Sequence, residues 1–157
     1  MKHAHVWKQT GSLVLWYYTE NERNYPGWHL TADTEGCRSL IALLDALAND
    51  GEPAMRTFQI KPPTAAHLAV PNNRAGHAAW HAPGKLKLAF SSDPCEWKFP
   101  VKQELAVLAL GAEPLRAMRN GLEDVLQGRG DYCIDVPHRN CAPLWFWWWP
   151  KSAIGRE

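Results

Sequence analysis

The sequence lacks most of the features that identify a protein class at first sight. Its formal net charge is only +1 over 157 residues, which is not the excess of basic residues typical of nucleic-acid binding. No apolar run reaches the ~18 residues that cross a bilayer, and the N-terminal MKHAHVWK lacks the apolar core of a secretory signal. We therefore expect neither a membrane nor a nucleic acid among its partners.

Cysteine is scarce as well, with Cys37, Cys95, Cys133 and Cys141 showing no tight pairing pattern. A chain of this length buries enough surface to fold without disulfides or a structural metal. We expect reduced thiols and a cytoplasmic protein.

Motifs for catalysis or cofactor binding are also missing. The chain has no phosphate-binding loop and no G-x-G-x-x-G, G-x-S-x-G or EF-hand pattern. His77 and His81 have the i, i+4 spacing of a helical zinc pair, but the catalytic glutamate of H-E-x-x-H is absent and Pro83 would end the helix. We expect no cofactor and no metal.

Two possible sites that contain cysteine have even less support in the sequence. The spacing of Cys133, His138 and Cys141 matches no known zinc pattern. Cys37, near the start of a predicted helix, is the best-placed nucleophile, but its position on the apolar stripe favours burial. We therefore expect no catalytic residue, and a protein that is not an enzyme.

What the chain does have is tryptophan, with nine residues in all. Four of them lie in the segment LWFWWWP at 144–150, where a strand would place Trp145, Trp147 and Trp149 on one face. Three tryptophans offer roughly 450–750 Å² of surface, which exceeds the largest apolar patch on a typical monomer, about 300–600 Å². The row must therefore be covered, either by another part of the chain or by a partner.

Hydrophobic periodicity predicts both strands and helices. Alternation of apolar and polar residues predicts strands at 12–19, 27–32, 55–61 and 85–91, and the segment 104–111, apolar on both faces, predicts a central strand covered twice. Helical spacing predicts helices at 33–49 and 113–127. Two hairpins are expected, one pairing 4–9 with 12–19 and one pairing 131–136 with 144–149.

These elements predict an α+β fold in a single domain spanning 1–157. We expect a mostly antiparallel, twisted sheet with two principal helices. The surroundings of the two helices are similar in pattern, so an alternative is two related β-α-β halves. A Pro/Ala-rich excursion at 62–84 interrupts the pattern, and a segment this long is either functional, for example as a cover of the sheet, or disordered.

The near-neutral total hides an uneven distribution of charge. Between Glu20 and Glu52 lie seven acidic residues and two basic ones, a local net charge of −5. This segment is either a solvated helix face or a docking surface that attracts a basic partner.

In size, and in the segments GWHLTADTEGCRSLIALLDAL, GRGDYCIDV and LWFWWWP, the chain resembles small bacterial immunity proteins. The resemblance implies a non-catalytic binding protein that neutralises a cognate protein toxin by occluding it. Interface hot spots favour tryptophan, tyrosine and arginine, and acidic residues speed encounter with a basic partner. The partner-binding candidates are therefore Glu35, Asp45, Trp80, Trp145, Trp147 and Trp149.

Two other hypotheses remain open. The first is a small enzyme or ligand-binding domain with an aromatic pocket beneath the 62–84 excursion. The second is a homodimer whose interface is the tryptophan row.

Overall fold

The computed structural model describes residues 3–51, 53–101, 105–130, 132–134 and 142–150. Within them, a five-stranded sheet has the order β4 (Trp80–His81), β1 (Leu13–Tyr18), β2 (Trp28–Ala32), β9 (Leu144–Phe146), β8 (Tyr132–Ile134). A four-stranded sheet has the order β3 (Met55–Gln59), β5 (Lys85–Phe90), β7 (Ala106–Leu110), β6 (Trp97–Lys98). The helices are α1 (His3–Val6), α2 (Thr34–Asp50), α3 (Ala65–Leu68) and α4 (Ala112–Leu126), with a 3-10 turn η1 (Asn73–Gly76). The α+β prediction is confirmed.

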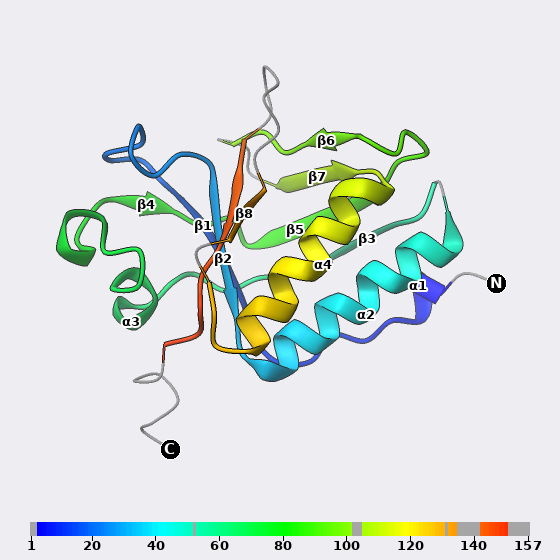
Figure 1. The fold of residues 1–157 in the computed structure, drawn as a ribbon, viewed down its shortest axis with the longest axis horizontal. Helices are drawn as coiled ribbons and strands as arrows, with labels where there is room; N and C mark the ends of the chain where they lie inside the picture. The colour runs from blue at the N-terminus through cyan, green and yellow to red at the C-terminus, as the bar shows by residue number, and fades with distance from the viewer. Residues whose placement is uncertain (1–2, 52, 102–104, 131, 135–141, 151–157) are drawn as a thin grey trace.

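The two long helices lie side by side across one face of both sheets (Figure 1). α2 begins where it does because the Asp33 carboxylate accepts hydrogen bonds from the Gly36 amide at 2.7 Å and the Ser12 amide at 3.0 Å. Pro114 lies in the first turn of α4, and Gly128, at φ 79°, follows its end. The guanidinium of Arg119 on α4 donates to Asp45 on α2 at 3.0 Å and so joins the helices.

The chain is built from two halves of the same topology that exchange strands. The first half runs β1-β2-α2-β3-β5, with further elements between β3 and β5, and the second runs β6-β7-α4-β8-β9. In the first half, β1 and β2 belong to the five-stranded sheet, and β3 and β5, which follow α2, belong to the four-stranded sheet. In the second half, β6 and β7 belong to the four-stranded sheet, and β8 and β9, which follow α4, belong to the five-stranded sheet. The contact between halves is a parallel strand pair in both sheets, β2 with β9 and β5 with β7. The predicted relation between the halves is thus present, but the halves are interlocked and do not pack as separate units.

Each sheet is antiparallel apart from its one parallel pair. The strands predicted at 12–19, 27–32, 55–61, 85–91 and 104–111, and both helices, are present within a few residues of their expected bounds. The hairpin between 131–136 and 144–149 is confirmed by the antiparallel pairing of β8 with β9.

The hairpin expected between 4–9 and 12–19 is wrong. Residues His3–Val6 form α1, because the Asp50 carboxylate accepts hydrogen bonds from the amides of His3 and Ala4 at 2.7 and 2.8 Å. The edges of β1 are instead taken by β2 and β4. The strand β7 is central but is not covered twice, since Ala106, Leu108 and Leu110 are buried while the alternate residues are only half-buried.

Two apolar cores result from this arrangement. The larger lies between the helices and the sheets, and a smaller one lies on the opposite face of the five-stranded sheet. No helix in the described part of the chain is both long and apolar enough to cross a membrane.

Candidate interaction surfaces

The tryptophan run begins in a strand and then leaves it. Leu144 and Phe146 of β9 point into the larger core, and Trp145 points to the opposite face. The strand ends at Phe146, although the Trp147 amide still donates to the Leu30 carbonyl at 2.9 Å. Trp147 still lies on the same face as Trp145 and is buried there, whereas Trp148 is 37% exposed.

Four aromatic rings form a stack on this face of the five-stranded sheet. The order is Trp16, His29, Trp147, Trp145, with successive ring centroids 5.6, 6.1 and 6.0 Å apart and interplanar angles of 24°, 18° and 17°. Three strands supply Trp16, His29 and Trp145 at neighbouring register positions. We call these four residues the aromatic stack.

His29 is held in this stack as a neutral ring. Its Nδ1 accepts a hydrogen bond from the Trp147 indole at 3.0 Å, which leaves Nε2 to donate to the Tyr25 carbonyl at 3.3 Å. Burial lowers the pKa of His29 to about 4, because the charged imidazolium would lose its hydration. Both ring nitrogens of His29 thus form hydrogen bonds within the chain and are not available to a substrate.

The 62–84 excursion lies over the aromatic stack. Leu68 of α3 and Ala78 pack against Trp147 in the smaller core, and the His67 ring is 4.7 Å from that of Trp149. The excursion is fastened to the β1–β2 connection by Asn73, whose amide nitrogen donates to the Glu20 carbonyl at 3.1 Å. The chain itself therefore covers the tryptophan row, although Trp145 and Trp149 remain partly exposed.

Five buried side-chain polar atoms have no hydrogen-bond partner among the described residues. They are Trp16 Nε1, Trp145 Nε1, the Tyr18 hydroxyl, Thr31 Oγ1 and His67 Nε2. Burial raises the pKa of the Tyr18 phenol to about 12, and the nearby Trp16 indole offsets only part of this effect.

The acidic residues of the 20–52 segment mostly have partners within the chain. Glu20 pairs with Arg74 at 3.4 Å, and Asp45 pairs with Arg119 at 3.0 Å. Asp33 and Asp50 cap α2 and α1. Glu35 is near Arg38, at 3.9 Å.

The six predicted partner-binding residues do not lie on one surface. Glu35 and Asp45 are on the exposed side of α2, and Trp80, 37% exposed, is on the edge strand β4. Trp145, Trp147 and Trp149 lie against the smaller core. Their role in binding stays a prediction.

The residues considered for chemistry are held apart or buried. Cys37 is 0% exposed, and burial raises the pKa of its thiol to about 12, so it is protonated. His77 follows η1 and His81 lies in β4, so they share no helix. No group of three or more His, Cys, Asp or Glu side chains suited to a metal occurs among the described residues. His138 and Cys141 lie outside those residues.

On the face of the four-stranded sheet that points away from the helices, the outward side chains of the described strands are exposed or half-buried. In register, Met55, Ala89, Ala109 and Lys98 form one row across the strands, and Thr57, Lys87 and Val107 form another. Met55 is 49% exposed, and Leu105, just before β7, is 37% exposed. The alternation in KLKLAFS indicated which residues point this way, but no pattern in the sequence indicated that the face is bare.

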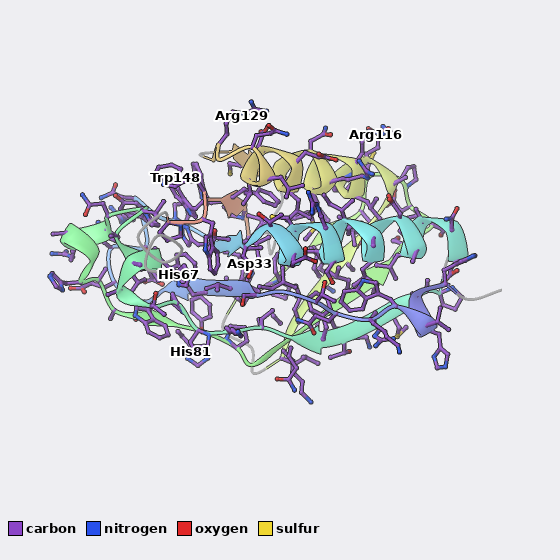
Figure 2. All side chains as sticks on the ribbon, turned by 90° about the horizontal axis from the view of Figure 1, so that it is seen from below. Asp33, His67, His81, Arg116, Arg129 and Trp148 are labelled. Carbon is purple, nitrogen blue, oxygen red and sulfur yellow. The ribbon has the colours of Figure 1, made fainter. Side chains whose placement is uncertain are left out.

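A second exposed feature is a cleft that no pattern in the sequence predicted. Gly128, Arg129, Gly130 and Trp148 line an open cleft of about 710 Å³, with Arg129 and Trp148 on the side of the molecule where α4 lies (Figure 2). Gly130 is required there, because a Cβ at this position would lie 2.6 Å from the backbone nitrogen of Trp148. Arg129 donates to Asp124 at 3.1 Å.

No protein-family model, curated protein or solved structure matches this chain.

Proposed function

We propose that this protein is a non-catalytic binding protein of the cytoplasm that neutralises a protein toxin by occlusion, as the immunity proteins it resembles do. The observation that carries the proposal is the open outer face of the four-stranded sheet. Among the described elements, helices cover the parallel pair at its centre, β5 with β7, on one side only. One solvated face is ordinary in a mostly antiparallel sheet, but this face presents the exposed Met55 together with lysines, so it suits a docked partner.

The state of the candidate reactive groups supports binding over catalysis. The Cys37 thiol is buried and protonated, and both ring nitrogens of His29 are engaged within the chain. A nucleophile or general base needs access to substrate and a pKa near the working pH, and neither group has them.

The test is co-expression with the product of the neighbouring gene, followed by size exclusion of the mixture. We expect rescue of growth and a stable complex. Replacing Met55 with Asp places a charge at an exposed position of the outer face and should weaken the complex, while Ala42→Asp, at an exposed position of α2, should not. Absence of both rescue and complex for the wild-type chain would refute the proposal.

A second candidate function is ligand binding beneath the 62–84 excursion. The buried indole nitrogens of Trp16 and Trp145, which have no partner among the described residues, favour a ligand with hydrogen-bond acceptors, because indole nitrogens only donate. Native mass spectrometry of the purified chain tests it, and a small molecule retained by the wild type but lost in Trp145→Phe would support it.

A further inference from the structure

We infer that the toxin presents an acidic surface to the outer face of the four-stranded sheet, with Lys85, Lys87 and Lys98 as its counter-charges. This inference rests on the proposed function. It also differs from the sequence-based expectation of a basic partner attracted by the 20–52 segment.

The first argument is the charge of the face. Lys85 and Lys87 on β5 and Lys98 on β6 all point outward, and Lys85 and Lys98 are exposed. None of the three forms an ion pair with another described residue. The outward positions of β3, β5, β6 and β7 carry no acidic side chain. The described part of this face is therefore purely basic.

The second argument is the contrast with the acidic segment. Asp45, Glu20 and Asp50 already have cationic or amide partners within the chain. A basic partner would have to replace these contacts, whereas an acidic partner finds unpaired ammonium groups on the sheet. Unpaired charges at a protein surface raise the association rate with a complementary partner.

The third argument comes from the internal repeat. The equivalent face of the five-stranded sheet is covered by the segment that connects β3 to β5, residues 60–84, which contains α3, η1 and β4. The corresponding connection in the second half, from β8 to β9, comprises residues 135–143 only. One sheet has an internal cover over its parallel pair. The four-stranded sheet has no such cover among the described residues, and in this proposal the partner protein covers its outer face.

The composition of the face favours a protein over a nucleic acid. Its apolar residues Met55 and Val107 lie among the lysines, and a mixed apolar and charged surface is typical of protein interfaces. The outward positions of the four strands carry no aromatic side chain on which a base could stack.

The experiment uses charge reversal in the full chain and the toxin encoded by the neighbouring gene. The double variant Lys85→Glu and Lys87→Glu is expected to raise Kd at least about tenfold, mostly through a slower association rate at low salt. The matched control is Arg38→Glu with Arg116→Glu, which makes the same change in net charge at exposed positions of α2 and α4. Arg116 lies on the helix side of the molecule (Figure 2), so the control should keep the wild-type Kd.

A charge swap then identifies the partner surface. Replacing acidic residues of the toxin interface with lysine should restore binding to the Lys85→Glu, Lys87→Glu variant. The same change in the toxin should not improve binding to the wild type or to the control variant. Thermal melting of each variant confirms that it folds. Should Lys85→Glu with Lys87→Glu misfold, the isosteric removal of charge by Lys87→Met serves in its place.

The outcomes separate the two proposals. If the wild-type chain forms no complex, the proposed function fails, and this inference with it. If the complex forms but tolerates the lysine reversals as well as the control, the inference alone fails. Binding of a short DNA duplex, or of phosphatidylglycerol vesicles, that the lysine reversals abolish while the toxin complex persists would also overturn it.

Discussion

His29 illustrates how a single residue links the tryptophan-rich strand to the rest of the chain. Its ring lies between Trp16 and Trp147 and accepts a hydrogen bond from the Trp147 indole 118 positions further along the chain. That bond requires an unprotonated Nδ1, so the neutral ring is part of the packing.

The buried His29 makes stability depend on pH. Its pKa is about 4 in the folded protein and about 6.5 when exposed, so below pH 6.5 the unfolded chain takes up a proton that the folded chain does not. The free energy of unfolding should therefore be highest above pH 6.5 and fall by about 3 kcal/mol as the pH decreases to 4. Burial lowers the pKa of His67 as well, which adds to the loss in the same direction.

Urea unfolding followed by tryptophan fluorescence at several pH values measures this dependence. The variant His29→Gln should be less stable at neutral pH but should show a shallower decrease in acid. An unchanged decrease in that variant would show that His29 is not the group responsible.

Gly121 is a second residue whose identity follows from packing. It lies within α4, where a Cβ would be 2.7 Å from the Phe146 ring, and Phe146 is 0% exposed. Alanine normally stabilises a helix by about 1 kcal/mol relative to glycine, but overpacking a core costs about 1–3 kcal/mol. The net of the two effects is a decrease in the unfolding free energy of up to about 2 kcal/mol for Gly121→Ala.

The matched control is Gly84→Ala. No heavy atom lies within 4 Å of a Cβ at Gly84, so its effect should stay within about 0.5 kcal/mol. Thermal unfolding compares the two variants, and a stabilised Gly121→Ala protein would contradict the close contact between α4 and β9.

At the scale of elements, the 62–84 excursion depends on one buried amide. Asn72, Arg74 and Ala75 have positive φ of 63°, 51° and 56°, which is unfavourable for residues other than glycine. Asn73 between them is 0% exposed and makes two hydrogen bonds, to the Glu20 carbonyl and from the Asn21 amide. These bonds hold the strained turn in place.

We expect Asn73→Ala to destabilise the protein by about 1–3 kcal/mol, because it leaves two groups on the β1–β2 connection without partners. The amides of residues 64–78 should exchange with deuterium faster than in the wild type, while those of α2 and α4 change less. Arg74→Ala, which removes only an exposed ion pair with Glu20, should have little effect. Equal exchange in both variants would show that Asn73 does not fasten the excursion.

The sequence predicted the individual helices and strands well, but it did not predict which faces of the sheets are covered by other segments. Alternation in KLKLAFS assigned Lys85 and Lys87 to one face of a strand, and helical spacing located α2. Whether a face is bare depends on which distant segment lies over it. The excursion covers one face of the five-stranded sheet, and the strand predicted at 144–149 ends at Phe146, where the pairing with β2 and β8 ends.

At the scale of the whole molecule, the two halves are interlocked. Each sheet takes two strands from each half, with β4 in addition, and the interface between them includes both parallel pairs and the contact of α2 with α4. Neither half can bury its sheet faces alone.

This predicts the behaviour of fragments. The exposed turn at Ser92 and Asp93 separates the halves, so the fragments 1–92 and 93–157 should each be unfolded in isolation and regain native-like circular dichroism when mixed. Cooperative thermal unfolding of either fragment by itself would contradict the exchanged arrangement.

The sequence by itself determined the local structure of this protein. The period of its apolar residues specified most strands and both long helices, and Asp33, Pro114 and Gly128 specified where those helices begin or end. Tertiary structure decided the rest, because the pairing of β2 with β9 and of β5 with β7 joins segments far apart in the chain. These long-range contacts bury Trp147 beneath the chain's own excursion and leave the lysines of β5 on an open face.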